Sequence, residues 1–255
     1  MSGERFQSIS QRYAAFRPRY PDTIVGAVAD RISVNAELSV LPVIDMGSGT
    51  GTFTRQLSER LPVGIAVVGV EPSTAMREQA MADNTRPNVS FRDGVAENIP
   101  VADGGASAVV AATAAHWFDR PHFYTECGRA LASKGVLAIV EYVRDEDEPA
   151  TQAVIEFLDR YGEPRAYVRP DYNRELRGLS EFHQFEHQRE RTKLHLTLDE
   201  YVGLALSSSH ARKAVNDLGE KEAAARLRQA GSAFADDTGT VPYGYIFEAF
   251  MVSHR

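Results

Sequence analysis

The sequence contains little cysteine and no long apolar run, and each shortage excludes a class of protein. The only cysteine, Cys127, rules out an internal disulfide framework. No apolar stretch reaches the length that a membrane-spanning helix requires. The first residues, Met1 to Arg5, have no signal-peptide pattern. These absences lead us to expect a cytoplasmic protein with no membrane partner.

Basic charge is also scarce. The chain has 28 lysine and arginine residues against 35 aspartate and glutamate residues, which gives a formal net charge of −7. A nucleic-acid-binding protein usually needs a basic face to neutralise phosphates, and the sequence has no block rich in lysine and arginine. We therefore expect no nucleic-acid partner. Apolar residues make up 43% of the 255 residues, which is enough for the core of one large globular domain.

Apolar runs alternate with amphipathic segments over the first 145 residues. Helices are predicted over 4–15 and 23–32, the second capped by Asp22, and the alternation that follows predicts strands near 41–46, 65–71, 88–92, 106–112 and 135–143 with helices at 50–60, 73–82 and 120–132. This order predicts an α/β fold, with a doubly wound, mostly parallel sheet and helices on both faces.

The pattern changes after about residue 145. A helix is predicted at 150–161, a loop at 162–177, extended chain at 182–187 and 194–198, and helices at 199–216 and 219–234. A final strand follows, in which alternate residues, including Tyr243, Tyr245 and Phe247, lie on one side. This region is predicted to be largely helical before it returns to the sheet.

The most informative segment is Val43 to Gly51, a buried strand that runs into a Gly-x-Gly-x-Gly loop and then a helix. Glycines let the backbone approach a ligand closely, and the helix presents unpaired N–H groups. Asp45, just before the glycines, would repel a phosphate but attract an ammonium group. The next predicted strand ends in Glu71, at the spacing where doubly wound nucleotide-binding folds place a carboxylate on ribose hydroxyls.

A dinucleotide-binding loop would have the pattern Gly-x-Gly-x-x-Gly. Thr52 occupies the position of the last glycine, and Asp45 is a poor neighbour for a pyrophosphate. A nicotinamide-dependent oxidoreductase is therefore the alternative rather than the leading hypothesis. A non-catalytic module that only binds a cofactor remains a second alternative.

Several segments resemble one family. The glycine loop with Asp45 resembles motif I of the class I S-adenosylmethionine-dependent methyltransferases, and Glu71-Pro72-Ser73-x-x-Met76 and Gly94-Val95-Ala96-Glu97-Asn98-Ile99-Pro100 resemble later segments of that family. The segments at 13–21 and 114–119 are similar to its type 11 subgroup, especially the trans-aconitate methyltransferase-like members. The resemblance covers about the first 145 residues. Val95 departs from it, because the family commonly has an acid there.

The resemblance implies a Rossmann-like methyltransferase fold with seven strands, of which the last is antiparallel, and a helical insertion that acts as a lid. It implies one methyltransferase domain over 1–255: an N-terminal cap (1–35), a cofactor-binding core (36–145), substrate-side and lid elements (146–240) and the final strand (241–255). S-adenosylmethionine would be the cofactor and S-adenosylhomocysteine its product. We expect a monomer or a homodimer.

The cofactor residues follow from these motifs and from the strand ends. Asp45 is expected to bind the methionine ammonium group, Glu71 the ribose hydroxyls, and the backbone of Val95 and Ala96, or the Glu97 carboxylate, the adenine. The full predicted set is Tyr13, Arg17, Asp45, Gly47, Ser48, Gly49, Glu71, Pro72, Met76, Gly94, Val95, Ala96, Glu97 and Thr113.

The acceptor side is less defined. His116 follows the fourth predicted strand and is the candidate catalytic residue, as a base or as a hydrogen-bond donor. The candidates for substrate binding are Arg19, Trp117, Tyr142, Tyr172, His210 and Tyr243. His183 and His187 are four residues apart, but in a predicted strand, so no metal site is expected.

Methyl transfer from a sulfonium needs alignment and a dry site more than acid catalysis. A base is needed only if the acceptor carries a proton. The acceptor is expected to be a small molecule, either a carboxylate or an aromatic intermediate of secondary metabolism. Methylation at oxygen, carbon or nitrogen remains open.

Overall fold

The computed structural model describes residues 18–163, 169–208 and 210–255. Within this part of the chain, seven strands form one sheet in the order β3-β2-β1-β4-β5-β7-β6. The strands are β1 (Val43–Met46), β2 (Val67–Val70), β3 (Val89–Arg92), β4 (Ala106–Ala112), β5 (Leu131–Arg144), β6 (Phe182–Thr197) and β7 (Thr240–His254). The predicted α/β class and the mostly parallel sheet are confirmed.

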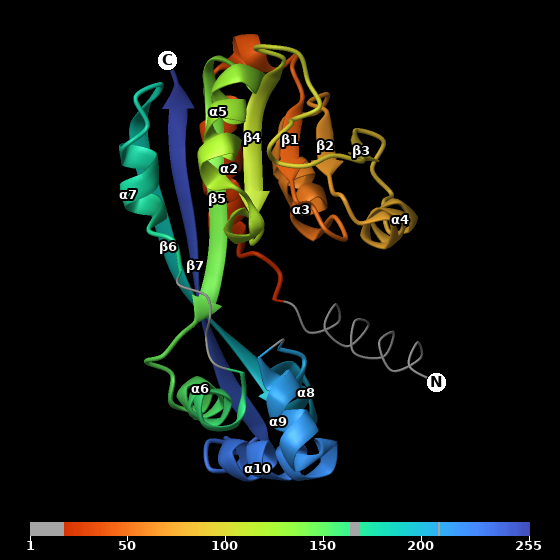
Figure 1. Cartoon of the computed structure of the whole chain (residues 1–255), viewed down its shortest axis with the longest axis vertical. Coiled ribbons are helices and arrows are strands. Elements are labelled where there is room, and N and C mark those ends of the chain that lie inside the picture. Colours follow the sequence, from red (N-terminus) through yellow and green to blue (C-terminus); the bar gives the residue numbers. More distant parts are fainter. Residues whose placement is uncertain (1–17, 164–168, 209) are drawn as a thin grey trace. The chain divides into compact units, whose positions relative to one another are not determined.

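The pairings show why the predicted order of strands produces this sheet. β1 pairs in parallel with both β2 and β4, β2 with β3, and β4 with β5. The arrow of β7 points opposite to those of β4 and β5 in Figure 1, so the predicted antiparallel last strand is also confirmed. Inserting β7 beside β5 leaves β6 at the edge of the sheet.

The helices of the first half agree with prediction to within a few residues. They are α2 (Asp22–Ser33), α3 (Thr52–Arg60), α4 (Thr74–Ala82) and α5 (Arg120–Ala130), with short 3-10 helices η1 (Ala36–Leu38) and η2 (Ala115–Trp117). Asp22 is the first residue of α2 and its side chain caps nothing. Its carboxylate instead lies in the first helical turn, where the helix dipole favours negative charge. The predicted helix at 4–15 lies outside the described residues.

The second half required three corrections. The helices are α6 (Pro149–Tyr161), α7 (Tyr172–Arg177), α8 (Leu198–Leu206), α9 (Ala211–Leu218) and α10 (Glu220–Ser232). The loop predicted at 162–177 was therefore wrong in its last third. The predicted helix at 199–216 is two helices, because a serine side chain competes for backbone hydrogen bonds. Ser207 Oγ donates a hydrogen bond to Leu204 O at 2.7 Å.

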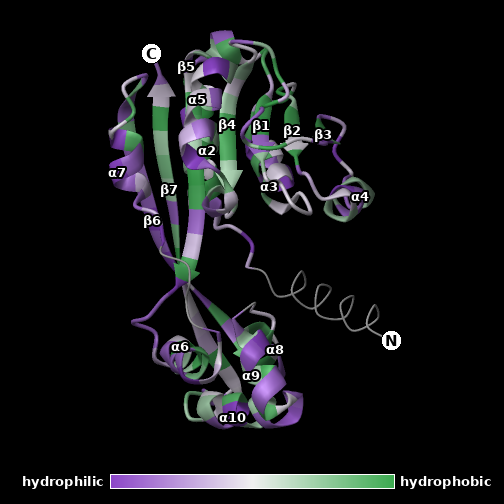
Figure 2. Ribbon diagram, in the orientation of Figure 1, coloured by the Kyte–Doolittle hydropathy of each residue, from purple (hydrophilic) through white to green (hydrophobic). Residues whose placement is uncertain are grey.

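The third correction concerns β6, which is continuous where the sequence predicted two separate extended segments. Most of its residues are exposed or only partly buried, since a strand at the edge of a sheet has few neighbours to bury it. Figure 2 shows it largely in the hydrophilic colour, whereas the central strand β4 is hydrophobic. Its polar sequence therefore lacks the clear alternation by which strands are predicted.

The central strands are buried on both faces. Ile44 and Val109 point into a cluster that includes Phe123 and Cys127 of α5, and burial raises the pKa of the Cys127 thiol. Their neighbours along the strands are buried as well, as are the apolar residues of α2 and α3. Cys127 is thus a core residue.

The described chain separates into two compact units. The first comprises 19–142, 169–190 and 247–255; the second comprises 143–163, 191–208 and 210–246, together with Pro18. The boundaries fall within β5, β6 and β7. The first unit contains β1 to β4, and the second contains α6, α8, α9 and α10.

Candidate functional site

The candidate site lies in the first unit, at the carboxyl ends of the parallel strands. β1, β2, β4 and β5 pair in register and end in the same direction (Figure 1). Open parallel sheets bind ligands at this edge. The loops that follow these strands carry most of the residues predicted from the sequence.

The glycine loop is fixed to the neighbouring strand by two backbone hydrogen bonds, from Gly47 N (2.8 Å) and Ser48 N (3.1 Å) to Val70 O. Gly47 has φ +67°, and a Cβ there would lie 2.6 Å from the Cβ of Ala114. Gly49 has φ +55°, but a Cβ there would meet no described atom within 4 Å. Glycine is thus needed for packing at Gly47, whereas Gly49 borders open space.

Asp45 is completely buried beneath this loop. The hydroxyl of Thr54 donates to its Oδ2 at 2.6 Å, while Oδ1 has no hydrogen-bond partner among the described residues. Burial raises the pKa of Asp45 to about 7; the Thr54 hydrogen bond opposes this shift and the charge of Glu71 adds to it. A nearby cation would favour the ionised form.

Glu71 holds the loop from the end of β2. Its Oε2 accepts a hydrogen bond from Gly49 N at 3.0 Å, and its Oε1 accepts one from Ser73 N at 2.9 Å. Ser73 in turn caps α4. Each carboxylate oxygen can accept a second hydrogen bond, so this arrangement leaves acceptor capacity for a pair of hydroxyl groups.

Thr113 follows β4 and has φ +53°, which is strained for a β-branched residue. Its hydroxyl lies 2.8 Å from that of Tyr20. The ring of Tyr20 contacts those of Tyr142 (6.1 Å between centroids) and Phe247 (5.9 Å). The predicted residues Thr113 and Tyr142 therefore share Tyr20 as a common neighbour.

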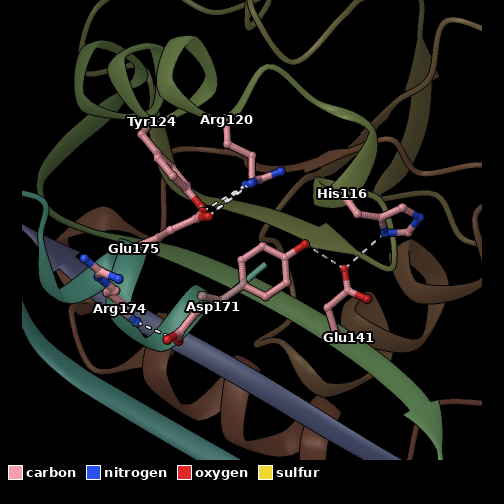
Figure 3. A network of polar contacts seen from close by, with 8 residues as sticks. His116, Arg120, Tyr124, Glu141, Asp171, Arg174 and Glu175 are labelled. Carbon is pink, nitrogen blue, oxygen red and sulfur yellow. Dashed lines mark hydrogen bonds and ion pairs between the residues drawn. The ribbon is translucent and has the colours of Figure 1, made fainter. Parts of the chain in front are cut away.

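His116 and Tyr172 meet at the carboxylate of Glu141, to which the sequence assigned no role. Figure 3 shows the contact between His116 and Glu141. His116 Nδ1 lies 3.3 Å from Oε1 of Glu141, and Tyr172 OH donates to the same oxygen at 3.1 Å. Glu141 and Tyr172 are buried, and the His116 side chain is 18% exposed. The three residues come from β5, α7 and η2, which are far apart in the sequence.

The other predicted cofactor residues surround the same edge with different exposures. Met76 and Val95 are about half exposed, and Ala96 is buried. Pro72 is exposed and Gly94 is partly buried. Glu97 accepts a hydrogen bond from Asp119 N at 2.8 Å. Tyr13 and Arg17 lie outside the described residues.

The predicted substrate residues are divided between the two units. Trp117 is 82% exposed next to His116, with ring centroids 5.0 Å apart, and Arg19 is exposed. His210 and Tyr243 belong to the second unit. There Tyr243 is fully buried and accepts a hydrogen bond from Arg144 Nε at 2.7 Å, so it has a packing role in that unit.

Sequence reasoning missed Thr54 as a site residue. It placed Glu141, with Tyr142, among the residues at the carboxyl ends of the parallel strands but gave Glu141 no role. Glu141 follows the apolar run 136–140, so a carboxylate at the end of a buried strand was the available signal. The partners of Glu141 were not predictable, because α7 was taken as a loop. Thr54 lies in the first turn of α3 and had no distinguishing pattern.

Neither a metal cluster nor a membrane span was found in the part of the chain that the structure describes. No group of three or more histidine, cysteine, aspartate or glutamate side chains is placed to bind a metal ion among these residues. None of the described helices has the length and apolar character to cross a membrane.

Comparison with known proteins agrees with this geometry. Residues 44–139, which span β1 to most of β5, match the methyltransferase-domain family Methyltransf_11. An uncharacterized methyltransferase of Mycobacterium bovis is 34% identical over 163 residues, which cover 62% of this chain and 60% of that protein. An uncharacterized methyltransferase-like protein of Schizosaccharomyces pombe is 34% identical over 152 residues, covering 58% and 56%.

The matched segments span about half to three fifths of the length of these curated relatives. A solved structure, of a provisionally named type II methyltransferase from Anaeromyxobacter dehalogenans, covers more: 94% of this chain and 98% of its own, at 25% identity and a TM-score of 0.68. These matches show that residues 44–139 resemble a methyltransferase domain and that the fold is shared with a solved structure of that kind.

Proposed function

We propose that this protein transfers a methyl group from S-adenosylmethionine to a small-molecule acceptor. When bound, this cofactor supplies a methyl group on a positively charged sulfur, with a neutral thioether as leaving group. Little acid catalysis is needed, so the chain's task is to bind the two reactants, align them and exclude water.

The observation that carries the proposal is a pair of unsatisfied polar atoms in the glycine loop. Among the described residues, six buried side-chain polar atoms lack a hydrogen-bond partner, and two of them are Asp45 Oδ1 and Ser48 Oγ. Buried polar groups in proteins nearly always have partners. Beside the open space at Gly49, these atoms fit a ligand that brings hydrogen-bond donors.

The residues present fit the proposed cofactor. Asp45 would receive the methionine ammonium group, directly or through one water. Glu71, already tied to the loop, would accept the ribose hydroxyls with its remaining lone pairs. The backbone near Val95 and the half-exposed side chain of Met76 would border the adenine. The strained Thr113 completes the proposed set of cofactor residues in the described chain.

The acceptor is proposed to be small because the sequence has no basic block for a nucleic acid. The resemblance to trans-aconitate methyltransferase-like proteins favours a carboxylate. The aromatic rings of Tyr20, Tyr142 and Phe247 favour a planar metabolite. The two classes differ in whether they need a base such as His116, because only an acceptor that carries a proton requires one.

Calorimetric titration with S-adenosylhomocysteine and with NAD tests the cofactor assignment. We expect S-adenosylhomocysteine to bind and NAD not to bind. Asp45→Ala and Glu71→Ala should each weaken binding about 10- to 100-fold, because a hydrogen bond to a charged group contributes about 1.5–3 kcal/mol. Glu78→Ala, an exposed carboxylate on α4, is the matched control and should bind normally. Binding of NAD alone would contradict the proposal.

Turnover is tested separately, by incubating the protein with methyl-labelled cofactor and a pool of metabolites. Transfer of the label to a compound of low molecular weight is expected. Cofactor binding without transfer across a broad pool would instead indicate a non-catalytic binding module.

A further inference from the structure

We propose that Glu141 and Tyr172 orient the ring of His116 so that its Nε2 accepts a proton from a hydroxyl group on the methyl acceptor. This inference rests on the proposed methyl transfer and deepens it, since it assigns the chemical class of the acceptor. His116 would be the catalytic base, and Glu141 and Tyr172 would be positioning residues.

The hydrogen-bond geometry determines which ring nitrogen can act. An ionised carboxylate only accepts hydrogen bonds. Glu141 Oε1 lies 3.3 Å from His116 Nδ1 and 3.1 Å from the Tyr172 hydroxyl, so Nδ1 must carry a hydrogen atom. In the neutral ring the lone pair that can take up a proton is then on Nε2. The carboxylate also stabilises the imidazolium that forms.

A catalytic base must be more accessible to the substrate than the residues that orient it, and the exposures of His116, Glu141 and Tyr172 follow this order. The side chain of Glu141 is 5% exposed and that of His116 is 18% exposed, and Tyr172 is 1% exposed. The charge-bearing group is thus withdrawn from water, while the ring that would meet the substrate is the more accessible member. η2, which carries His116, follows β4 at the ligand-binding edge of the sheet.

Tyr172 is held in place by the way α7 is anchored. Asp171 caps this helix by accepting a hydrogen bond from Arg174 N at 3.0 Å. Glu175 accepts hydrogen bonds from two nitrogens of Arg120, at 2.9 and 3.1 Å, and from the hydroxyl of Tyr124 at 2.6 Å. Figure 3 shows these contacts beside the His116–Glu141 pair. α7 therefore presents Tyr172 to Glu141 from a fixed position.

The chemistry balances with a hydroxyl acceptor. As the acceptor oxygen attacks the methyl carbon, its proton moves to Nε2 of His116. The carbon–sulfur bond breaks and its electron pair stays on the sulfur. One positive charge is lost from the sulfur and one appears on the imidazolium, next to Glu141. A carboxylate acceptor has no proton to lose at neutral pH, so it would leave this base unused.

The tautomer of His116 can be measured without a substrate. In two-dimensional ¹⁵N–¹H spectra of the full-length protein, we expect neutral His116 to show the pattern of the Nδ1–H tautomer, with the signal assigned by its loss in His116→Asn. Glu141→Ala should shift the ring toward the Nε2–H form, and Tyr172→Phe should weaken the preference. Glu78→Ala is the control and should leave the spectrum unchanged.

An Nε2–H tautomer in the wild-type protein would overturn the proposal. If Glu141→Ala does not fold, Glu141→Leu provides the second variant, because it fills similar space and has no acceptor for the Nδ1–H group. An unchanged pure Nδ1–H pattern in the variant that folds would show that Glu141 does not set the tautomer.

The product gives the second readout. We expect the transferred label to survive mild alkali as a methyl ether, and His116→Asn to lower turnover about 100-fold or more with cofactor affinity retained. A methyl ester, which alkali cleaves, or an N-methyl product would overturn the assignment of a hydroxyl acceptor while leaving methyl transfer intact. Failure of S-adenosylhomocysteine to bind would instead remove the proposed function itself.

Discussion

Asp45 and Glu141 are both buried carboxylates on parallel strands of the same unit, yet their surroundings differ. Glu141 meets two donors from distant segments, His116 and Tyr172, at one oxygen. Asp45 receives one hydrogen bond, from Thr54, and its other oxygen has no partner within the described chain. The protein itself thus supplies hydrogen-bond donors to Glu141. Oδ1 of Asp45 has no such donor among the described residues, and a ligand can supply one.

This difference separates two ways of building a site. The glycine loop, Asp45 and Thr54 come from one short stretch, since they all lie within ten residues. The acceptor side is assembled from η2, β5 and α7, and depends on α7 being correctly docked. Changes at Asp45 and the loop should reveal the effect of a buried charge that has one hydrogen-bond donor, and changes at Glu141 should disrupt hydrogen bonds already made.

The largest contrast is expected between Asp45→Asn and Glu141→Gln. The folded-state pKa of Asp45, about 7, lies above the ordinary aspartate value of 3.8. The folded protein therefore binds this proton more tightly, and stability falls as the pH rises from about 4 to about 7. Asp45→Asn removes this loss, so relative to wild type it should gain up to about 4 kcal/mol between pH 4 and pH 8.

Glu141→Gln should instead lower the free energy of unfolding at pH 8, by about 1–3 kcal/mol, because it weakens two hydrogen bonds to a charged acceptor. Urea denaturation of both variants at a series of pH values measures the two effects. If the stability of Asp45→Asn relative to wild type does not increase with pH, the pKa of Asp45 is not raised by burial, and the predicted difference between the two carboxylates is wrong.

The glycine loop gives a smaller and more specific effect. Gly47→Ala should cost about 2–4 kcal/mol, because the new Cβ meets Ala114 and the backbone has a left-handed φ. Gly49→Ala should cost only about 1 kcal/mol, since only the φ is unfavourable, but it should weaken S-adenosylhomocysteine binding by filling the open space. Denaturation and calorimetry on both variants would separate packing from ligand binding. Equal stability losses with equal affinities would contradict this division.

The smallest effect is expected at Arg120. Arg120→Ala removes a partly exposed ion pair with Glu175, which should cost about 0.5–1 kcal/mol. α7 should remain docked, because Tyr172 and Leu176 are buried. Leu176→Ala is the comparison and should cost about 2–5 kcal/mol. A loss at Arg120 as large as that at Leu176 would mean that charge, rather than burial, holds α7.

The cofactor side could be predicted closely because its signals are local. Val43 to Gly51 contains a strand, the loop and a helix start in one run, and Glu71 follows at a fixed spacing. The small apolar residues of 106–112 likewise identified β4 with its correct bounds. The assignment of individual residues to S-adenosylmethionine remains a prediction.

The second half was less predictable for physical reasons that particular residues show. β6 is polar because it forms an edge, α7 is only six residues long, and Ser207 interrupts what looked like one helix. Tyr172 was a candidate substrate residue on the basis of its chemistry alone. Its contact with Glu141 depends on where α7 docks, which local periodicity does not encode.

The sequence by itself determined the α/β class, the succession of strands along the chain and the glycine loop with its two acids. These features depend on hydrophobic periodicity and on residues close together along the chain. Only the tertiary structure decided that Asp45 retains an unsatisfied oxygen and that Glu141 joins His116 to Tyr172. Burial and long-range hydrogen bonding arise from packing between distant segments, and this packing assigns each carboxylate its role.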